Sequence, residues 1–313
     1  MVLSLSIPGP PDLFGLTLLL LLGLAVYVSL ISLMTACRLT RPPRRTYGWA
    51  VARGVPGDPS ELDQPLASES WTFQSRGRDL PVWDVAGLDP EGPVIVVTHG
   101  WGSSRIGTLV RLPALAEVAS RVVLWDMPGH GDAPGACELA FGEVDDLRAL
   151  VSRIRDDRPL VLYGWSLGGE VTLRAVAGGL GADAVVLEGV YRTGLIPAWN
   201  VMKQAGYPVL VNAPAAMAII GLRHGLRPGR RFEDITPLAN NVAAPALVLH
   251  GSIDQTSPIE DGRAIADAMP NAEFIEIDSA GHNDIWSEEH AAPAREAVQE
   301  LARRFRASST RPA

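Results

Sequence analysis

The chain has 313 residues and a mass of 33.4 kDa, with 47% hydrophobic and 20% charged residues. This apolar fraction excludes a disordered chain, and the length allows one large domain or two small ones. Two cysteines, Cys37 and Cys137, are too few for a disulfide framework, and the net charge of −8 argues against nucleic acid as a partner.

The first feature along the chain is a run of 25 residues without formal charge, 13–37, most of them Leu, Val, Ile or Ala. At about 1.5 Å per residue, such a helix crosses a hydrocarbon core of about 30 Å. No Lys or Arg precedes the run, which disfavours a cleavable signal peptide. The sequence LMTAC at 33–37 loosely resembles a bacterial lipoprotein cleavage box. The missing basic residues before the run and the late position of Cys37 disfavour that interpretation. We expect residues 1–40 to be a transmembrane anchor that places the protein in a lipid bilayer.

Basic residues lie only on one side of this run. Residues 1–53 carry five arginines against one aspartate, a net charge of +4, so the remaining residues carry −12. Four of these arginines follow the run directly: Arg38, Arg41, Arg44 and Arg45. Because positive flanks stay on the cytoplasmic side, we expect a single-pass membrane protein whose body lies in the cytoplasm.

Proline-rich residues 41–70 indicate a linker, and a different pattern begins at Trp71. Short apolar runs predict strands over 71–76, 80–86, 93–98, 121–126, 159–163, 184–188, 245–250 and 273–277. Longer periodic stretches predict helices near 106–119, 142–155, 167–178, 258–268 and 291–306. This alternation is typical of a mostly parallel sheet covered by helices on both faces.

One segment interrupts this alternation. Residues 191–241 contain several prolines and no convincing strand, so we interpret them as a cap over the carboxyl ends of the strands. We expect one α/β domain over 71–306 that includes this cap, and a loose tail over 307–313.

A GxSxG motif, Gly164-Trp165-Ser166-Leu167-Gly168, follows a predicted strand and opens a predicted helix. A nucleophilic serine needs such a sharp turn, and the two glycines let strand and helix approach without Cβ clashes. An ordinary helix N-cap serine is the plainer alternative.

A second loop, His99-Gly100-Trp101-Gly102, follows another buried strand. Its backbone N–H groups can point at the same spot as the N–H of Leu167. We assign the two donors of an oxyanion hole to Trp101 and Leu167, and a plain strand-to-helix turn that needs glycine is the alternative.

Acid candidates lie at the ends of later strands. Asp254 follows the strand over 245–250 and is placed to orient a histidine, whereas Glu188 ends the strand over 184–188 and is its rival. Asp126, Asp278 and Asp284 are more distant candidates.

His282 lies between the last predicted strand and the last helix, where it could take a proton from Ser166. The other histidines have plainer explanations: His99, His130 and His250 precede turn glycines, and His224 and His290 lie in polar surroundings. We see no metal-ligand spacing among the six.

Serine, acid and histidine follow one another in the order typical of one superfamily. The sequence over about 71–305 resembles an α/β-hydrolase-fold serine hydrolase, including the D-x-x-G-x-G loop that starts at Asp126. The Gly-His-Asn-Asp ending, the short cap and the leading span look like single-pass, membrane-anchored Bem-type hydrolases. The HGWG and GWSLGG motifs are similar to pimeloyl-carrier methyl-ester esterases. A haloalkane dehalogenase is disfavoured, because it would have Asp in place of Ser166.

This resemblance implies an α/β-hydrolase fold and an esterase without a metal or organic cofactor. Ser166 would be the nucleophile, His282 the base and then the acid, and Asp254 the residue that orients His282. Trp101 and Trp165 would give the substrate pocket aromatic walls, which favours a lipophilic ester or acyl substrate. A thioesterase, a serine peptidase and a catalytically silent binding module remain alternatives, and the oligomeric state stays open.

Overall fold

Eight strands form one sheet in the order β1-β2-β4-β3-β5-β6-β7-β8 in the computed structural model, which describes residues 13–223 and 233–306. The strands are β1 (Ser68–Ser75), β2 (Arg78–Ala86), β3 (Val94–Thr98), β4 (Arg121–Trp125), β5 (Leu160–Trp165), β6 (Ala184–Glu188), β7 (Ala246–Gly251) and β8 (Ala272–Ile277). β2 pairs antiparallel with both β1 and β4, and the remaining neighbours pair in parallel. The sheet is therefore mostly parallel, as the sequence predicts.

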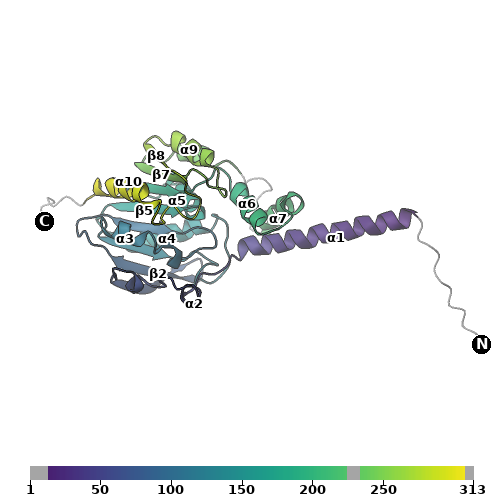
Figure 1. Cartoon of the computed structure of the whole chain (residues 1–313), viewed down its shortest axis with the longest axis horizontal. Coiled ribbons are helices and arrows are strands. Elements are labelled where there is room, and N and C mark those ends of the chain that lie inside the picture. Colours follow the sequence, from purple (N-terminus) through teal and green to yellow (C-terminus); the bar gives the residue numbers. More distant parts are fainter. Residues whose placement is uncertain (1–12, 224–232, 307–313) are drawn as a thin grey trace, which may run out of the picture.

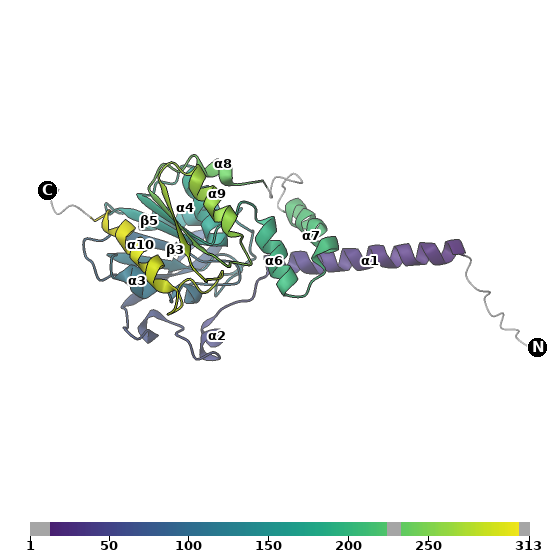
Figure 2. The same ribbon diagram turned by 45° about the horizontal axis from the view of Figure 1, so that its top comes forward.

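Helices cover both faces of the sheet (Figures 1 and 2). α3 (Leu112–Ala116) and α10 (Ala291–Arg303) pack together on one face. The other face carries α4 (Glu143–Ile154), α5 (Leu167–Ala177), α8 (Thr236–Ala239) and α9 (Ile259–Ala268). Successive side chains of a strand point to opposite faces, so Val94 and Val96 pack toward α4 and α5, whereas Ile95 and Val97 pack on the α3 side. Both faces are buried, which explains why these strands are continuous apolar runs.

The predicted strands all occur, with ends within three residues of the expected ones. The helix expected over 106–119 is shorter: it is divided into a 3₁₀ turn, Ile106–Thr108, and α3. Pro113 at the start of α3 explains the break, because a proline has no N–H for a helical bond to the preceding turn.

The segment expected as a linker, 41–70, is packed against the body. It forms the short helix α2 (Tyr47–Val51) and the 3₁₀ turn Pro59–Glu61, and β1 already begins at Ser68. Ala50 and Leu66 belong to the core on the α3 side. Arg44 donates hydrogen bonds to two backbone carbonyls in the loop after β4. The contacts of segment 41–70 with the body are too scattered in sequence to give a periodic pattern.

The region expected as a cap contains two kinds of helix. α6 (Leu195–Gln204) and α7 (Val209–Arg223) lie beside the end of the first helix, α1 (Leu13–Thr40), in both views (Figures 1 and 2). α8, in contrast, packs against α5 and α9 in the body. The predicted tail, 307–313, and His224 lie outside the described residues.

α1 projects away from the body (Figure 1). Within the described ranges it is the one helix whose length and composition suffice for crossing a membrane. Only 6% of its most apolar 18-residue stretch is buried, whereas the core helix of a soluble protein would be mostly buried.

A buried carboxyl at the start of α4 leads to a prediction about stability. Burial, reinforced by nearby Glu138 and Asp146, raises the pKa of Glu143 from 4.5 to about 7. Between these two values the folded chain binds more protons than the unfolded chain, so this group lowers stability as the pH rises from about 4.5 to about 7. We expect Glu143→Gln to be about 3 kcal/mol more stable than wild type at pH 9 and nearly equal to it at pH 4.5. Urea unfolding of the full chain in detergent at both pH values measures this, and a difference that does not depend on pH would contradict it.

Candidate active site

Ser166 stands at a sharp turn between β5 and α5. Its backbone has φ 54° and ψ −114°, an unfavourable conformation for a residue with a side chain. Two glycines make the turn possible. A Cβ on Gly164 would overlap the carbonyl oxygen of Gly168, and a Cβ on Gly168 would overlap that of Thr98. The GxSxG pattern therefore has the local structure that the sequence predicts for it.

Three residues from the ends of three strands form a hydrogen-bonded chain. The Oγ of Ser166, after β5, lies 2.9 Å from Nε2 of His282, after β8. Nδ1 of the same imidazole lies 2.6 Å from Oδ2 of Asp254, after β7. An ionised carboxylate can only accept, so the proton is on Nδ1 and Nε2 is free to accept the serine proton. The structure thus brings together the serine, histidine and aspartate singled out in the sequence.

The loop around Asp254 keeps this carboxylate ionised. Its Oδ1 accepts the backbone N–H groups of Thr256 and Ser257, both at 2.8 Å. Burial favours the neutral acid, but contacts with His250 and His282 and the N–H of Ser257 outweigh it and hold the pKa of Asp254 below its usual value. The carboxylate is therefore negatively charged at neutral pH and fixed in orientation toward His282.

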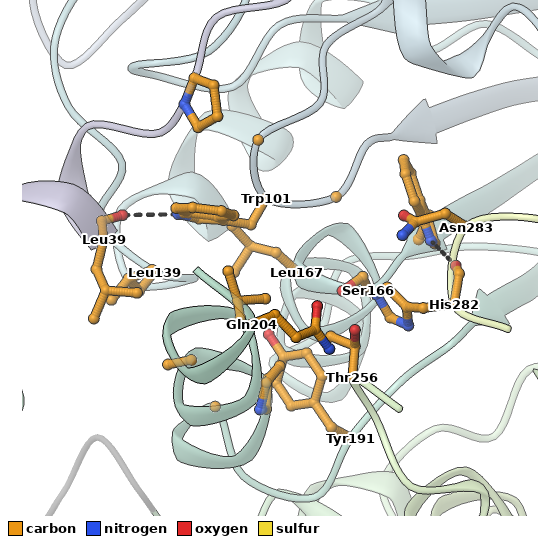
Figure 3. A pocket seen from close by; sticks show the side chains of 18 of the residues that line it. Leu39, Trp101, Leu139, Ser166, Leu167, Tyr191, Gln204, Thr256, His282 and Asn283 are labelled. Carbon is orange, nitrogen blue, oxygen red and sulfur yellow. Dashed lines mark hydrogen bonds between the residues drawn. The ribbon is translucent and has the colours of Figure 1, made fainter. Parts of the chain in front are cut away.

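A cavity of about 270 Å³ opens onto Ser166 and His282 (Figure 3). Its walls come from the loop after β3, the loop after β6, α6 and the end of α1. They are mainly apolar and include Leu39, Trp101, Leu139, Trp165, Leu167, Tyr191, Pro197, Ala198 and Val201. Both predicted aromatic walls, Trp101 and Trp165, are thus present. An acyl or other apolar group fits such a lining better than a strongly charged group does.

Both predicted oxyanion donors lie at this cavity. Trp101 and Leu167 line it together with Ser166. The loop that carries Trp101 runs close to the serine, because a Cβ on Gly100 would lie 3.3 Å from Cβ of Ser166. The neighbouring His99 is buried and holds this loop: its Nδ1 donates to the carbonyl of Gly100, and its Nε2 accepts the N–H of Met127.

The rival acid, Glu188, is engaged elsewhere. Its carboxylate accepts hydrogen bonds from Arg111, Tyr163 and Trp286, and all of these groups are buried. The guanidinium of Arg111 lies 4.4 Å from the ring centroid of Trp165, so this ion pair supports the tryptophan of the GxSxG motif. Glu188 contributes to the serine turn through its backbone, because its carbonyl accepts the N–H of Ser166 at 2.7 Å.

The more distant acid candidates have local partners. Asp126 accepts the backbone and guanidinium N–H groups of Arg105, both at 2.7 Å. Asp284 accepts the N–H of Gly281, and Asp278 the hydroxyl of Ser279. These three carboxylates shape loops around the site rather than contact His282.

The remaining histidines in the described ranges have structural partners. Burial lowers the pKa of both His99 and His130, the latter to about 4, so both are neutral. His250 bonds to the carbonyl of Ser257, and His290 to the hydroxyl of Ser287. Over 13–223 and 233–306, no group of three His, Cys, Asp or Glu side chains is arranged to hold a metal ion.

Sequence reasoning did not identify two features of the cavity. Leu39, at the end of α1, lines it, and its carbonyl accepts the indole N–H of Trp101 at 2.8 Å. Arg45 also lines it. Its guanidinium lies 4.9 Å from the ring centroid of Trp49 and forms no salt bridge with a carboxylate that the structure describes. Burial and the charges of Arg53 and Arg111 lower the pKa of Arg45. Neither residue carried a motif; both follow from how the chain after α1 folds back onto the body.

Comparison with known proteins agrees with this geometry. Residues 94–297, more than half of the chain, match the Alpha/beta hydrolase family. A pimeloyl-[acyl-carrier protein] methyl ester esterase of Chromobacterium violaceum is 27% identical over 236 residues, which cover 64% of this chain and 91% of that protein. Uncharacterized protein YfhR of Salmonella typhimurium is 26% identical over 252 residues, which cover 75% of this chain and 81% of that protein.

Solved structures share the fold. An esterase of Pyrococcus furiosus superposes with a TM-score of 0.66 at 19% identity and covers 86% of this chain and 99% of its own. The family match, the sheet order and the serine turn agree with one another. The chain therefore belongs to the Alpha/beta hydrolase family, as a hydrolase of the esterase type.

Proposed function

We propose that this protein is a membrane-anchored serine hydrolase that cleaves a lipophilic carboxylic ester through an acyl-enzyme. The observation that carries this proposal is the hydrogen-bonded chain Ser166–His282–Asp254 at the wall of an apolar cavity. A hydroxyl is a weak nucleophile, and a neighbouring base of this geometry activates it.

In this proposal each residue takes one step, which its contacts support. Ser166 Oγ attacks the ester carbonyl while Nε2 of His282 takes its proton, and the same proton then goes to the departing alcohol. Water then attacks the acyl-serine while Nε2 of His282 takes its proton, and this proton returns to Ser166 Oγ as the acid departs. The ionised Asp254 stabilises the imidazolium formed in each half, and the backbone N–H groups of Trp101 and Leu167 stabilise the oxyanion.

The anchor in this proposal is the apolar run 13–37 in α1. The arginines that follow it support a single-pass topology with the body in the cytoplasm. The resemblance to Bem-type hydrolases also implies a single-pass anchor. The domain organisation that we propose is this anchor, a packed connecting arm, and one hydrolase domain whose cap contains α6 and α7.

One observation favours a second candidate substrate. Arg45 stacks on Trp49 but has no carboxylate partner among the described residues, and it would favour an ester that carries an anionic group, since a bound anion would relieve the cost of partly burying this cation. The curated relative from Chromobacterium violaceum is named for a methyl ester on an acyl-carrier protein, so methyl esters and carrier-bound acyl groups belong in the same test.

The test is a substrate panel with the purified full chain in detergent. Nitrophenyl esters of rising chain length are compared with thioesters, amides, methyl esters and esters that carry a terminal carboxylate. We expect esters to be cleaved faster than the matched amides, with a preference for longer acyl chains. No turnover of any member by folded protein would contradict the proposal, and faster cleavage of thioesters or amides would redirect it to a thioesterase or peptidase.

A further inference from the structure

The outward face of α7 is apolar. No charged residue occurs between Lys203 and Arg223, a stretch that includes almost all of this helix. Its exposed positions recur every fourth residue at Leu210, Pro214, Ala218 and Leu222, and the two leucines are 80% and 69% exposed. A helix that faces water normally shows charged or polar residues there, whereas one that is apolar all round lies in protein or lipid.

The inward face of α7 packs against the end of α1. Ala36 and Leu39 of α1 form one buried cluster with residues of α6 and α7, namely Met202, Val209, Ala213, Ala216, Met217 and Ile220. Asn212 donates a hydrogen bond of 2.6 Å to the hydroxyl of Thr35 across this contact. Interhelical bonds of this kind are common between helices in membranes.

The length of α1 indicates how deep in a bilayer its contact with α7 would lie. Its 28 residues make a helix about 42 Å long, which matches a bilayer about 40–45 Å thick including the headgroup layers. The part buried against α7 is the last third, Ser32–Thr40. If α1 spans the membrane, α7 lies at the level of the headgroups and the upper acyl chains, and Lys203 and Arg223 flank it as phosphate-binding side chains would.

Two of these helices, α1 and α6, line the cavity. Leu39 of α1 and Pro197, Ala198 and Val201 of α6 line it, and Figure 3 shows Leu39 and Trp101 at the end opposite His282. A smaller cavity of about 30 Å³ shares Leu139 and Leu167 with it and reaches Met217 of α7. The apolar part of the cavity thus extends from the serine toward the α1–α7 contact.

We propose that α7 is an interfacial membrane helix and that α1, α6 and α7 present the cavity to the bilayer, so that the substrate is an acyl ester resident in the membrane. This inference rests on the proposed function for the chemistry of the substrate, but the position of α7 is independent of it. The occupant of the exposed leucine face is the lipid bilayer, because this face continues the exposed apolar surface of α1.

A quenching experiment tests the position of α7 without any activity measurement. Fluorophores are placed on Leu210→Cys, Leu222→Cys and the matched control Leu88→Cys, which is 58% exposed on a loop after β2. All are made in a Cys37→Ser background, since Cys37 is exposed and Cys137 is buried. In phosphatidylcholine–phosphatidylglycerol vesicles, lipids with acyl-chain nitroxides should quench both α7 sites at least threefold more than the control. Equal quenching at the three sites, or quenching of α7 only by a labelled second copy, would overturn the proposal.

A second experiment tests the substrate class. Hydrolysis rates are measured on a long-chain ester embedded in vesicles and on a short water-soluble ester, and the first rate is divided by the second. This ratio is compared for wild type, Leu210→Glu, Leu222→Glu and the control Leu88→Glu. The ratio should fall at least tenfold in the α7 variants and stay within twofold in the control; an unchanged ratio in all variants would overturn delivery from the bilayer. Failure of wild type on both esters would instead count against the proposed function, and quenching would still decide where α7 lies.

Discussion

Ser166→Ala and His282→Ala are each expected to lower kcat for ester hydrolysis by about 10⁵–10⁶-fold, since either change removes the attacking alkoxide. Residues that act as one unit are not additive, so the double variant should be no slower than either single variant. A residual rate about 10³-fold above that of water should remain from the oxyanion site and substrate binding.

The measurement is a steady-state rate for the four proteins on one ester, with thermal unfolding as the control for folding. Ser166→Ala removes only a hydroxyl and should unfold at nearly the wild-type temperature. Full activity of either single variant would contradict the proposed roles, and so would a double variant whose loss is the product of the two single losses.

The second large effect separates the two acid candidates. In Asp254→Asn the amide would donate to Nδ1 of His282 and move the imidazole proton to Nε2, which could then no longer accept the proton of Ser166. We expect kcat to fall about 10⁴-fold. Stability should also fall at neutral pH, because the lowered pKa of Asp254 means that the folded chain favours the carboxylate over a neutral group, although the amide oxygen can still accept the N–H groups of Thr256 and Ser257.

Glu188→Gln is the matched variant, for which we expect a large loss of stability and little loss of activity. It would leave the guanidinium of Arg111, 2% exposed, buried without its anion, at a cost of about 3–5 kcal/mol in stability. The activity per folded molecule should stay within about tenfold of wild type, because the carboxylate does not contact His282. Urea unfolding and rates at a temperature where both variants are folded measure the two effects. A harmless Asp254→Asn together with an inactive Glu188→Gln would reverse the assignment of the acid.

The strands and the hydrogen-bonded arrangement of Ser166, His282 and Asp254 could be predicted because their signals are local. Val94–Thr98 is a short run of β-branched residues that is typical of a strand covered on both faces, and GxSxG carries the steric demand of its turn in five adjacent residues. The order of Ser166, Asp254 and His282 along the chain then limits the topology, since each follows a different parallel strand.

Other features depend on contacts that no sequence period encodes. The ion pair of Arg111 with Glu188 joins two distant segments beneath Trp165, and the charges alone do not indicate it. The arm over 41–70 packs through single side chains such as Ala50 and Leu66, so it looked like a linker. The sequence of α7 is apolar, but its exposed face and its position beside Leu39 and Thr35 of α1 required the structure.

The most direct test of the central claim is covalent labelling of Ser166. A fluorescent fluorophosphonate reacts with a serine only where a base activates the hydroxyl. Membranes that contain the full wild-type chain should be labelled, and the modified peptide should be the one that carries Ser166, whereas Ser166→Ala and His282→Ala membranes should stay unlabelled. Labelling that persists in Ser166→Ala, or no labelling of folded wild type, would contradict the account.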